Sequence, residues 1–594
     1  MSGGFPEGSP SVADLLLARA DDDNPAVVAG DAEWTWAQTV AASAGRAALL
    51  CSFDGWTSPA STARVDQLAA SARPAKPARP DQVLPPHIGV LLGNEPEYLF
   101  WLGAAALAGA VVVGINPTRR GEALAGDIRR TDCRVLVTDA EGAALLDGLD
   151  TGVPGDRIVR IDDSGYRTRV AAFADVSAAA VVAASAPGPS DLFLLLFTSG
   201  TTGAPKAVRC TQGRLASIAV RAAEAYGFDA SDVAYCAMPL FHGNALMVLW
   251  GPSLVTGATV ALARRFSASG FLPDVQQYGA TTFTYVGKAL AYVLATDPTD
   301  DDATCTLRRG FGTEASVADH AAFEARFSCV LTEGYGSSEG GAAINRVPGT
   351  PVGSLGMPSE DVVVLDPVTL RECPPAEFDR SGALVNGADA VGEIVNRSGT
   401  GRFEGYYNDV GATTDRSRNG WYWTGDLAYR DVAGFFYFAG RGGDWMRVDS
   451  ENLTAGPIER VLVRYAEIAA VAVYPVPDPR SGDQVMAALE LLPGRTFDPA
   501  DFARFLADQD DLGTKWIPAY LRVTAALPQT ASGKVTKGPL RTDGWRQGDE
   551  AVYRRLLGTD AGPGEIAYVP LTSADREALL DEFRRHGRMG LIGG

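Results

Sequence analysis

Lysine is scarce in this chain of 594 residues, although basic side chains are not. Of the 52 basic residues only six are lysines, at positions 76, 206, 288, 515, 534 and 537, so arginine supplies the ordinary surface charge. A lysine is therefore expected where a compact, mobile amine is needed. Lys206 ends the run TSGTTGAPK, and Lys534 and Lys537 lie in PQTASGKVTK. Both runs have the composition of phosphate-binding segments.

Net positive charge and paired cysteines are also lacking. The formal net charge of −20 argues against nucleic acid or an anionic membrane surface as the main partner, because both attract a basic face. The seven cysteines form no CxxC pair, so we expect reduced thiols in a cytoplasmic protein rather than a disulfide frame. Neither they nor the four histidines suggest a cluster of metal ligands. The first residues lack the pattern of a secretory signal.

One uncharged run, from Tyr98 to Asn116, is long enough to cross a bilayer. Its first half is rich in alanine and glycine, Gly109 interrupts it, and Ala110 to Ile115 has the β-branched composition of a strand. Periodicity alone does not separate a membrane span from a buried helix followed by a strand. We expect the buried helix-to-strand unit, with at most peripheral membrane contact, and a membrane anchor is the alternative.

Apolar runs alternate with helix-like stretches through the first half of the chain. The strand-like runs are His87–Leu92, Ala110–Ile115, Val135–Thr138, Phe193–Phe197 and Thr259–Ala263. This rhythm predicts parallel sheets covered by helices. Residues 52–86, rich in Pro, Ala, Ser and Arg, are expected to be an irregular insertion. Short strands of a small barrel or distorted sheet are expected over residues 352–438, and a compact second domain after Gly440.

A loop of small and hydroxyl residues follows the apolar run Leu192–Phe197. Its backbone N–H groups can surround phosphate oxygens, and a lysine beside them adds a cation. The residues assigned to this phosphate grip are Thr198, Ser199, Gly200, Thr201, Thr202, Gly203 and Lys206. The run is not a Walker A motif, because Lys206 follows Pro205 and precedes Ala207. A flexible surface turn is the alternative.

Three further segments suggest nucleotide chemistry. LTEGYGSSEG, residues 331–340, offers an aromatic ring that can stack on a base and a carboxylate, Glu339, that can hold Mg²⁺. GFGTE, residues 310–314, lies just upstream and is expected to line the same pocket. In WYWTGD, residues 421–426, Asp426 can accept hydrogen bonds from two ribose hydroxyls. A solvated turn aspartate is an equally consistent interpretation of Asp426.

Five motifs in order resemble those of the adenylate-forming superfamily of acyl-CoA synthetases, adenylation domains and luciferases. They are TSGTTGAPK, YGSSEG, WYWTGD, GRGGDWMRVDSEN and PQTASGKVTK, which together span residues 198 to 537. GDWMR at residues 443–447 and the tail YVPLT at residues 568–572 are similar to the fatty-acid-transport-protein/very-long-chain acyl-CoA synthetase branch of actinobacterial FadD-type ligases. The resemblance covers nearly the whole chain and is weakest over residues 52–86.

The resemblance implies an α/β fold in two domains. Residues 1–440 would form a large N-terminal adenylation domain of parallel αβαβα-type sheets with a small β-barrel region. Residues 441–594 would form a smaller, mobile α+β domain that carries Lys534. Because Lys534 would serve the first reaction step and obstruct the second, the family rotates this domain between steps, with Asp444 at the hinge.

The resemblance also implies three catalytic residues. Lys534 would bridge the acyl carboxylate and the α-phosphate, and Glu339 would hold Mg²⁺. His242, in MPLFHGNA, would lie beside the acyl carboxylate, and a core histidine satisfied by backbone groups is the alternative. Lys537 is expected to be structural. The apolar segment Ala245–Val255 is a candidate wall of an acyl tunnel, although such a stretch is more often core.

ATP would be bound by the phosphate grip together with residues of the later motifs. These are Gly312, Thr313, Glu314, Tyr335, Gly336, Ser338, Asp426 and Arg441. Tyr335 would stack on adenine, while Asp426 and Arg441 would bind ribose. Ser338 stands where the family usually has threonine, a change that keeps the hydroxyl.

The implied activity is that of an AMP-forming acid–thiol ligase using ATP, Mg²⁺ and coenzyme A. Its substrate would be a hydrophobic acid, either a long or very-long-chain fatty acid or a steroid side-chain acid. An acyl-AMP ligase that loads a carrier protein and a membrane-associated lipid-uptake protein are the alternatives. The oligomeric state is left open, with a homodimer as one expectation.

Overall fold

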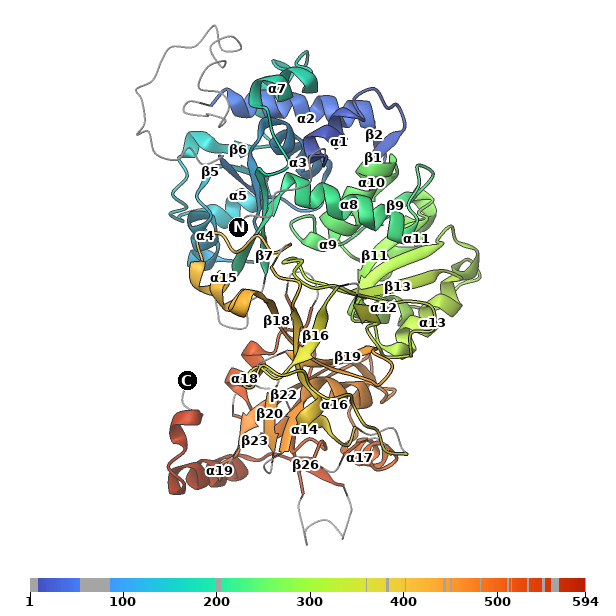
Figure 1. Cartoon of the computed structure of the whole chain (residues 1–594), viewed down its shortest axis with the longest axis vertical. Coiled ribbons are helices and arrows are strands. Elements are labelled where there is room, and N and C mark those ends of the chain that lie inside the picture. The colour runs from blue at the N-terminus through green and yellow to red at the C-terminus, as the bar shows by residue number, and fades with distance from the viewer. Residues whose placement is uncertain are drawn as a thin grey trace.

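Two lobes of unequal size and a separate antiparallel sheet make up the described part of the chain. The sheet lies between and beside the lobes (Figure 1). The structure is a computed structural model. It describes residues 9–53, 86–198, 205–358, 360–380, 384–400, 402–441, 445–448, 451–480, 482–509, 512–513, 515–530, 534–546, 551–556 and 566–592. Sheets and helices alternate along the chain, so the predicted α/β fold class is confirmed.

A six-stranded sheet forms one layer of the larger, N-terminal lobe, in the order β6-β5-β3-β4-β7-β8. Its strands are β3 (His87–Leu91), β4 (Val111–Gly114), β5 (Cys133–Thr138), β6 (Ile158–Arg160), β7 (Leu192–Thr198) and β8 (Lys206–Thr211). All neighbours are parallel except β7 and β8. Parallel strands are covered on both faces, which is why the four predicted runs in this sheet are mainly apolar.

A nine-stranded sheet forms the second layer, in the order β15-β14-β13-β12-β11-β9-β10-β1-β2. Its strands are β1 (Pro25–Ala29), β2 (Ala32–Thr35), β9 (Val233–Cys236), β10 (Thr259–Leu262), β11 (Thr282–Val286), β12 (Arg309–Thr313), β13 (Val330–Tyr335), β14 (Ile344–Asn345) and β15 (Met357–Pro358). The central pairs are parallel, and antiparallel pairing is confined to the two edges. The fifth predicted run is β10.

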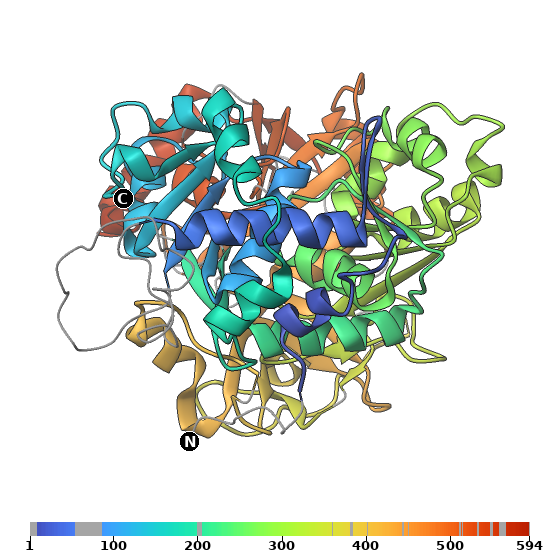
Figure 2. The ribbon, with the colours of Figure 1, turned by 90° about the horizontal axis from the view of Figure 1, so that it is seen from above.

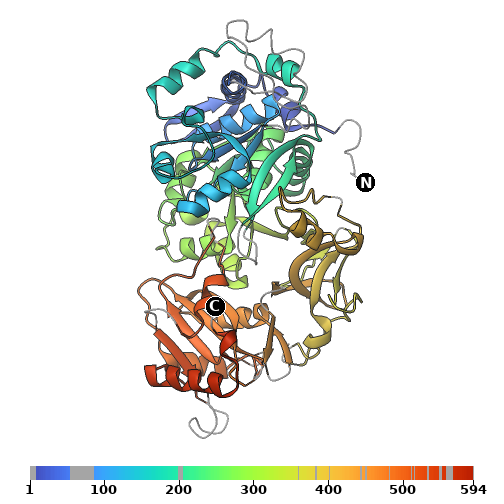
Figure 3. The same cartoon turned by 90° about the vertical axis from the view of Figure 1, so that its left-hand side faces the viewer.

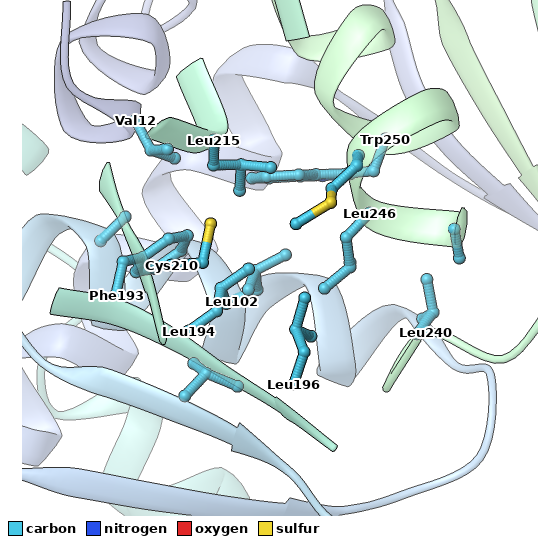
Figure 4. Packing of buried hydrophobic residues seen from close by; sticks show 14 of the residues in the cluster. Val12, Leu102, Phe193, Leu194, Leu196, Cys210, Leu215, Leu240, Leu246 and Trp250 are labelled. Atoms are coloured by element: carbon cyan, nitrogen blue, oxygen red, sulfur yellow. The ribbon is translucent and has the colours of Figure 1, made fainter. Parts of the chain in front are cut away.

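Helices pack between and outside these sheets. They are α1 (Val12–Leu17), α2 (Trp36–Cys51), α3 (Pro96–Ala108), α4 (Gly121–Arg130), α5 (Ala140–Leu146), α6 (Ser164–Ala171), α7 (Ala178–Ser185), α8 (Gln212–Tyr226), α9 (Gly243–Ala245), the π-helix η3 (Leu246–Trp250), α10 (Gly251–Thr256), α11 (Phe271–Tyr278), α12 (Gly287–Leu294) and α13 (Val317–Phe327). Seen from above, α2 lies across one end of the lobe (Figure 2). In the core, Leu102, Phe193, Leu215 and Trp250 bring α3, β7, α8 and η3 together (Figure 4).

The uncharged run from Tyr98 to Asn116 is a buried helix followed by a strand, as predicted. Helix α3 begins with Pro96 in its first turn and ends at Gly109, whose φ of 67° is the left-handed conformation that favours glycine. Every residue of α3 from Tyr98 onward is buried, which explains a helix that is apolar all round. Within the described residues, no helix has the length and apolar character of a membrane span.

An antiparallel sheet, β16-β17-β18-β19, accounts for the predicted region of short strands and turns. Its elements are β16 (Val362–Leu365), α14 (Gly387–Ala390), β17 (Gly392–Asn396), α15 (Val410–Arg416), β18 (Tyr422–Arg430) and β19 (Phe436–Arg441). Register shifts interrupt the pairing of β17 with β18 and of β18 with β19. Of the two expected forms, a small barrel and a distorted sheet, the described strands form the distorted sheet. The sheet is open, because its first and last strands do not pair with each other.

The smaller lobe follows β19 and lies below the N-terminal lobe, beside the antiparallel sheet (Figure 3). Its elements are β20 (Trp445–Val448), β21 (Glu451–Thr454), α16 (Ala455–Leu462), β22 (Ile468–Pro477), β23 (Asp483–Leu491), α17 (Pro499–Ala507), β24 (Tyr520–Thr524), α18 (Gly538–Asp543), β25 (Ala551–Arg555), β26 (Tyr568–Pro570) and α19 (Ser573–Arg585). Two hydrophobic clusters in this lobe contain only residues from 446 onward. These separate cores agree with the predicted domain boundary after Gly440, which stays a prediction.

Candidate active site

A large cleft lies between the lobes and is lined by both. It encloses about 3900 Å³, which is several times the volume of an ordinary small-molecule pocket, so a nucleotide and a second substrate fit together. The lining includes ten of the predicted site residues: Thr198, Lys206, His242, Gly312, Thr313, Glu314, Tyr335, Gly336, Ser338 and Glu339. Asp426 and Lys534 line it from the antiparallel sheet and the smaller lobe.

The phosphate grip joins two antiparallel strands. Thr198 ends β7 and Lys206 begins β8, and the two residues face each other in the register of the pair. The segment is therefore flanked by two antiparallel strands, unlike a Walker A loop, which is flanked by a strand and a helix. The predicted residues Ser199, Gly200, Thr201, Thr202 and Gly203 lie outside the described residues.

Glu339 is a buried carboxylate next to these two strands, with 8% of its surface exposed. Its Oε1 accepts a hydrogen bond of 2.9 Å from the Tyr406 hydroxyl, and the Thr198 hydroxyl lies 3.5 Å away. The Lys206 ammonium lies over the Tyr406 ring, 5.5 Å from its centroid. A carboxylate, a hydroxyl and an amine therefore meet at one point, which is a suitable donor set for Mg²⁺ and phosphate.

Sequence reasoning missed Arg416, on α15, which lines the same part of the cleft. Its Nη1 donates to the Trp423 carbonyl oxygen at 3.2 Å. A Cβ added at Gly425, where φ is 73°, would lie 2.3 Å from that nitrogen, so the glycine makes room for the guanidinium. Burial lowers the pKa of Arg416, but the neighbouring Tyr406, Tyr422 and Glu339 outweigh it and raise the pKa, which keeps the cation charged. A single arginine in an arginine-rich chain gives no signal in the sequence.

The predicted adenine and ribose residues converge from two sheets. β12 and β13 are parallel neighbours, so Thr313 and Tyr335, at their carboxyl ends, meet at one edge. The Tyr335 hydroxyl donates a 2.6 Å hydrogen bond to Oδ2 of Asp426 on β18. Burial, followed by the Asp426 charge, raises the pKa of Tyr335, so its hydroxyl remains a donor.

Asp426 is thus a partly buried strand residue rather than a solvated turn residue. In the antiparallel register it pairs with Arg441, the last residue of β19, whose side chain lies outside the described atoms. Gly312 lies against the ring of Tyr285, and an added Cβ would lie 2.4 Å from that ring. The close approach explains why a glycine is needed at this position.

Lys534 reaches the cleft from the smaller lobe. Its Nζ lies 2.9 Å from Oε1 of Glu314, and the two side chains are 35% and 49% exposed. Burial and, after it, the charge of Lys534 lower the pKa of His242 from 6.5 to about 4. The ammonium therefore contacts Glu314, and its charge also acts on His242. At neutral pH His242 is uncharged, so Lys534 supplies the positive charge at this point.

The predicted acyl tunnel is divided between cleft and core. Within Ala245–Val255, Met247 and Val248 on the π-helix η3 line the cleft. Leu246, Leu249 and Trp250 belong to the hydrophobic core, as Met247 also does. π-Helical turns are frequent at functional sites. Further apolar lining was not predicted from the sequence. It comes from Ile218, Ala222 and Tyr226 of α8 and from Phe311, whose ring stacks on Tyr226 at 4.2 Å.

Two predictions fall on segments that the structure does not describe. Asp444, the expected hinge, and residues 54–85 of the insertion expected at 52–86 lie outside the described residues. Lys537 forms an ion pair of 2.8 Å with Glu459 of α16, inside its own lobe, in agreement with the structural role expected of it. The catalytic and binding roles given to the cleft residues also stay predictions.

Comparison with known proteins gives the family. Residues 36–407 match the AMP-binding enzyme family, and residues 457–534 match the AMP-binding enzyme C-terminal domain. The chain belongs to the AMP-binding enzyme family, as its five ordered motifs predicted. Solved structures with this fold include the anthranilate CoA ligase AuaEII with anthranoyl-AMP, which has a TM-score of 0.73 and 19% identity over 91% of this chain and 98% of that one. ATP-bound MatB from Rhodopseudomonas palustris has a TM-score of 0.70 and 23% identity over 89% and 98%.

Two curated relatives match over nearly their whole length. Steroid-22-oyl-CoA synthetase of Rhodococcus jostii is 51% identical over 98% of this chain and 99% of the relative. The medium/long-chain-fatty-acid–CoA ligase FadD17 of Mycobacterium tuberculosis is 44% identical over 90% and 97%. Because both are CoA synthetases or ligases of the AMP-binding family, the predicted acid–thiol ligase is confirmed at the level of the enzyme class.

Proposed function

We propose that this chain is an ATP-dependent acyl-CoA synthetase that activates a large hydrophobic acid through an acyl-adenylate. The observation that carries the proposal is the position of Lys534, whose ammonium enters the cleft from the smaller lobe and pairs with Glu314 at 2.9 Å. Glu314 directly follows β12, the strand that carries Gly312 and Thr313. The amine is therefore held at the edge of the predicted nucleotide pocket.

In the first step a carboxylate oxygen of the acid attacks the α-phosphorus of ATP, and the bond from that phosphorus to the leaving pyrophosphate breaks. Negative charge is shared between the acid and the α-phosphate in the transition state, and the Lys534 ammonium would lie between them. Catalysis of this kind depends mainly on positioning. His242, which is neutral at pH 7, would lie beside the acyl carboxylate without forming an ion pair with it.

Mg²⁺ fits the site by the chemistry of its donors. The Glu339 carboxylate and the Thr198 hydroxyl are hard oxygen ligands, which this ion prefers together with substrate phosphates. When bound, Mg²⁺ would neutralise charge on the phosphate oxygens. Tyr406 holds Oε1 of Glu339 and would keep the carboxylate turned toward Thr198.

In the second step the thiolate of coenzyme A attacks the acyl carbonyl, and the bond to AMP breaks. Lys534 would then stand in the path of the thiol, so we place a mobile domain at residues 441–594, turning about Asp444 against residues 1–440. The hydrophobic clusters support this division, since those of the smaller lobe share no residue with those of the larger. Coenzyme A is favoured over a carrier protein by the two relatives, both of which are CoA enzymes.

For the acid, we propose a steroid side-chain carboxylate, because steroid-22-oyl-CoA synthetase is 51% identical over nearly the full length. A medium- or long-chain fatty acid is the second candidate, favoured by the likeness to FadD17. Both need an apolar wall, which η3, α8 and Phe311 supply.

The test is a panel of acids that differ in chain length and ring content, assayed for ATP-dependent pyrophosphate release with and without coenzyme A. We expect release with steroid side-chain acids and formation of a CoA thioester only when coenzyme A is present. Pyrophosphate release without formation of a CoA thioester, with transfer of the acyl group to a carrier protein instead, would indicate an acyl-AMP ligase. No release with any acid would end the proposal.

A further inference from the structure

A second ion pair joins the two lobes, and the reaction scheme above does not use it. Lys288 on α12 of the N-terminal lobe lies with its Nζ 2.7 Å from Oε2 of Glu490 on β23 of the smaller lobe. The two side chains are only 8% and 3% exposed. Lys288 is one of the chain's six lysines, so an amine here departs from its general use of arginine.

Glu490 collects donors from both lobes. The Tyr292 hydroxyl, also on α12, donates to Oε1 at 2.9 Å, and the backbone N–H of Leu527 donates to Oε2 at 2.7 Å. The Lys288 ammonium lies over the Tyr292 ring, 5.3 Å from its centroid. One buried carboxylate is therefore tied to a helix of the larger lobe and to the backbone of its own lobe.

Leu527 stands at the base of the turn that presents Lys534. The Thr536 N–H donates to the Pro528 carbonyl oxygen at 2.8 Å, and the Thr530 N–H donates to the Lys534 carbonyl oxygen at 2.7 Å. Gln529 and Val535 form an antiparallel bridge between them. The backbone contact from Glu490 to Leu527 thus fixes the start of a narrow hairpin that has Lys534 on its return strand.

The other end of the pair is linked to Glu314. Gly287, immediately before Lys288, packs so closely on the Glu314 backbone that an added Cβ would lie 1.9 Å from the Glu314 carbonyl oxygen. Two neighbouring ion pairs therefore join the lobes. The lysine comes from the N-terminal lobe in the pair of Lys288 with Glu490, and from the smaller lobe in the pair of Lys534 with Glu314. The pair of Lys534 with Glu314 is exposed, and exposed ion pairs contribute little free energy. Removing one partner of a buried pair has a much larger effect.

We propose that Lys288 and Glu490 are positioning residues for Lys534, which hold the smaller lobe docked for adenylate formation and separate for thioester formation. The proposal rests on the proposed function. Because the pair joins the two lobes, it exists only while they are docked, and rotation of the smaller lobe would return both charges to water. The pair therefore stabilises the docked arrangement of the lobes relative to the rotated one, and so favours the reaction step that needs docking.

The test separates the two half-reactions in Lys288→Met and Glu490→Gln variants of the full chain. We expect pyrophosphate release without coenzyme A to fall about 10- to 100-fold, because misplacement of one catalytic group has effects of that order. Thioester formation from supplied acyl-adenylate should remain within about threefold of the unaltered chain or become faster. Lys288→Arg, which keeps the cation, should recover most of the first step. The exchanged pair Lys288→Glu with Glu490→Lys should recover part of it.

The control is Arg46→Met, which breaks an ion pair inside the N-terminal lobe whose cation is buried to a similar degree. Arg46 pairs with Glu97, and these side chains are 9% and 21% exposed. We expect this change to affect both half-reactions by the same factor, through stability alone. Equal loss of both half-reactions in Lys288→Met, or an unchanged first step, would overturn the positioning role.

A second readout does not depend on activity. Since Lys534 lies close enough to His242 to lower its pKa, undocking in Lys288→Met should raise that pKa, as Lys534→Ala itself should. An unchanged His242 pKa in Lys288→Met would overturn the proposal even if the acid is unknown. Absence of pyrophosphate release from the unaltered chain, with a raised His242 pKa in Lys288→Met, would instead reject the proposed function and keep the docking pair.

Discussion

The protonation of His242 gives a prediction whose size follows from the structure. Its pKa is lowered from 6.5 to about 4, first by burial and then by the charge of Lys534. Between these two values the unfolded chain binds a proton that the folded chain does not, so the free energy of unfolding falls as the pH falls. The contribution is complete above pH 6.5 and is lost toward pH 4. It amounts to about 3 kcal/mol in total, of which about 2 kcal/mol is lost by pH 5.

The chain has four histidines, at positions 87, 242, 320 and 586, so histidine-selective ¹³C labelling gives a spectrum simple enough to titrate. We expect one resonance, absent from His242→Gln, to titrate well below 6. In Lys534→Ala it should move upward but stay below 6.5, because burial remains. Urea unfolding of the unaltered chain and His242→Gln should converge in stability by about 2 kcal/mol from pH 7 to pH 5. A resonance near 6.5 that ignores Lys534→Ala would refute both the burial of the ring and its closeness to the amine.

Three further changes test the remaining parts of the cleft. Glu339→Gln keeps the shape and removes the charge, so pyrophosphate release should fall about 100- to 1000-fold and need more Mg²⁺; an unaltered Mg²⁺ dependence would contradict the assignment. Tyr335→Phe removes the hydrogen-bond donor to Asp426 and should raise the KM for ATP about tenfold. The control Tyr465→Phe removes a similar hydrogen bond of 2.9 Å to a carboxylate in the smaller lobe and should leave this KM unchanged. Asp444→Pro fixes a backbone torsion and should spare pyrophosphate release while blocking thioester formation; an unimpaired overall rate would argue against a hinge there.

The parts of the fold that the sequence predicted are those with strong local signals. Buried parallel strands are apolar on both faces, so β3, β4, β5, β7 and β10 are readable as continuous runs. The helix α3 was separated from a membrane span by the glycine that ends it and by the strand composition after it. The antiparallel pairing of β7 with β8 was not predicted, because the residues of the loop between them suit either connection.

For the site, composition identified the individual residues but not their partners. The contact between Lys534 and Glu314 joins positions 220 residues apart, and no local pattern encodes such a distance. Glu490 lies near the end of a largely apolar strand, and the sequence does not show that its carboxylate meets Lys288 on α12. Arg416 was missed because arginine is common in this chain, whereas the scarcity of lysine made Lys534 visible.

The most direct test of the account is to measure both half-reactions in Lys534→Ala. An exposed ion pair contributes about 0 to 1 kcal/mol, so the variant should fold and melt close to the unaltered chain. We predict that acyl-adenylate formation falls at least about 100-fold, as when a charge-stabilising group is removed from a transition state. Thioester formation from supplied acyl-adenylate and coenzyme A should persist. Equal loss of both reactions, or an unaffected first step, would contradict the role given to the amine that the smaller lobe carries into the cleft.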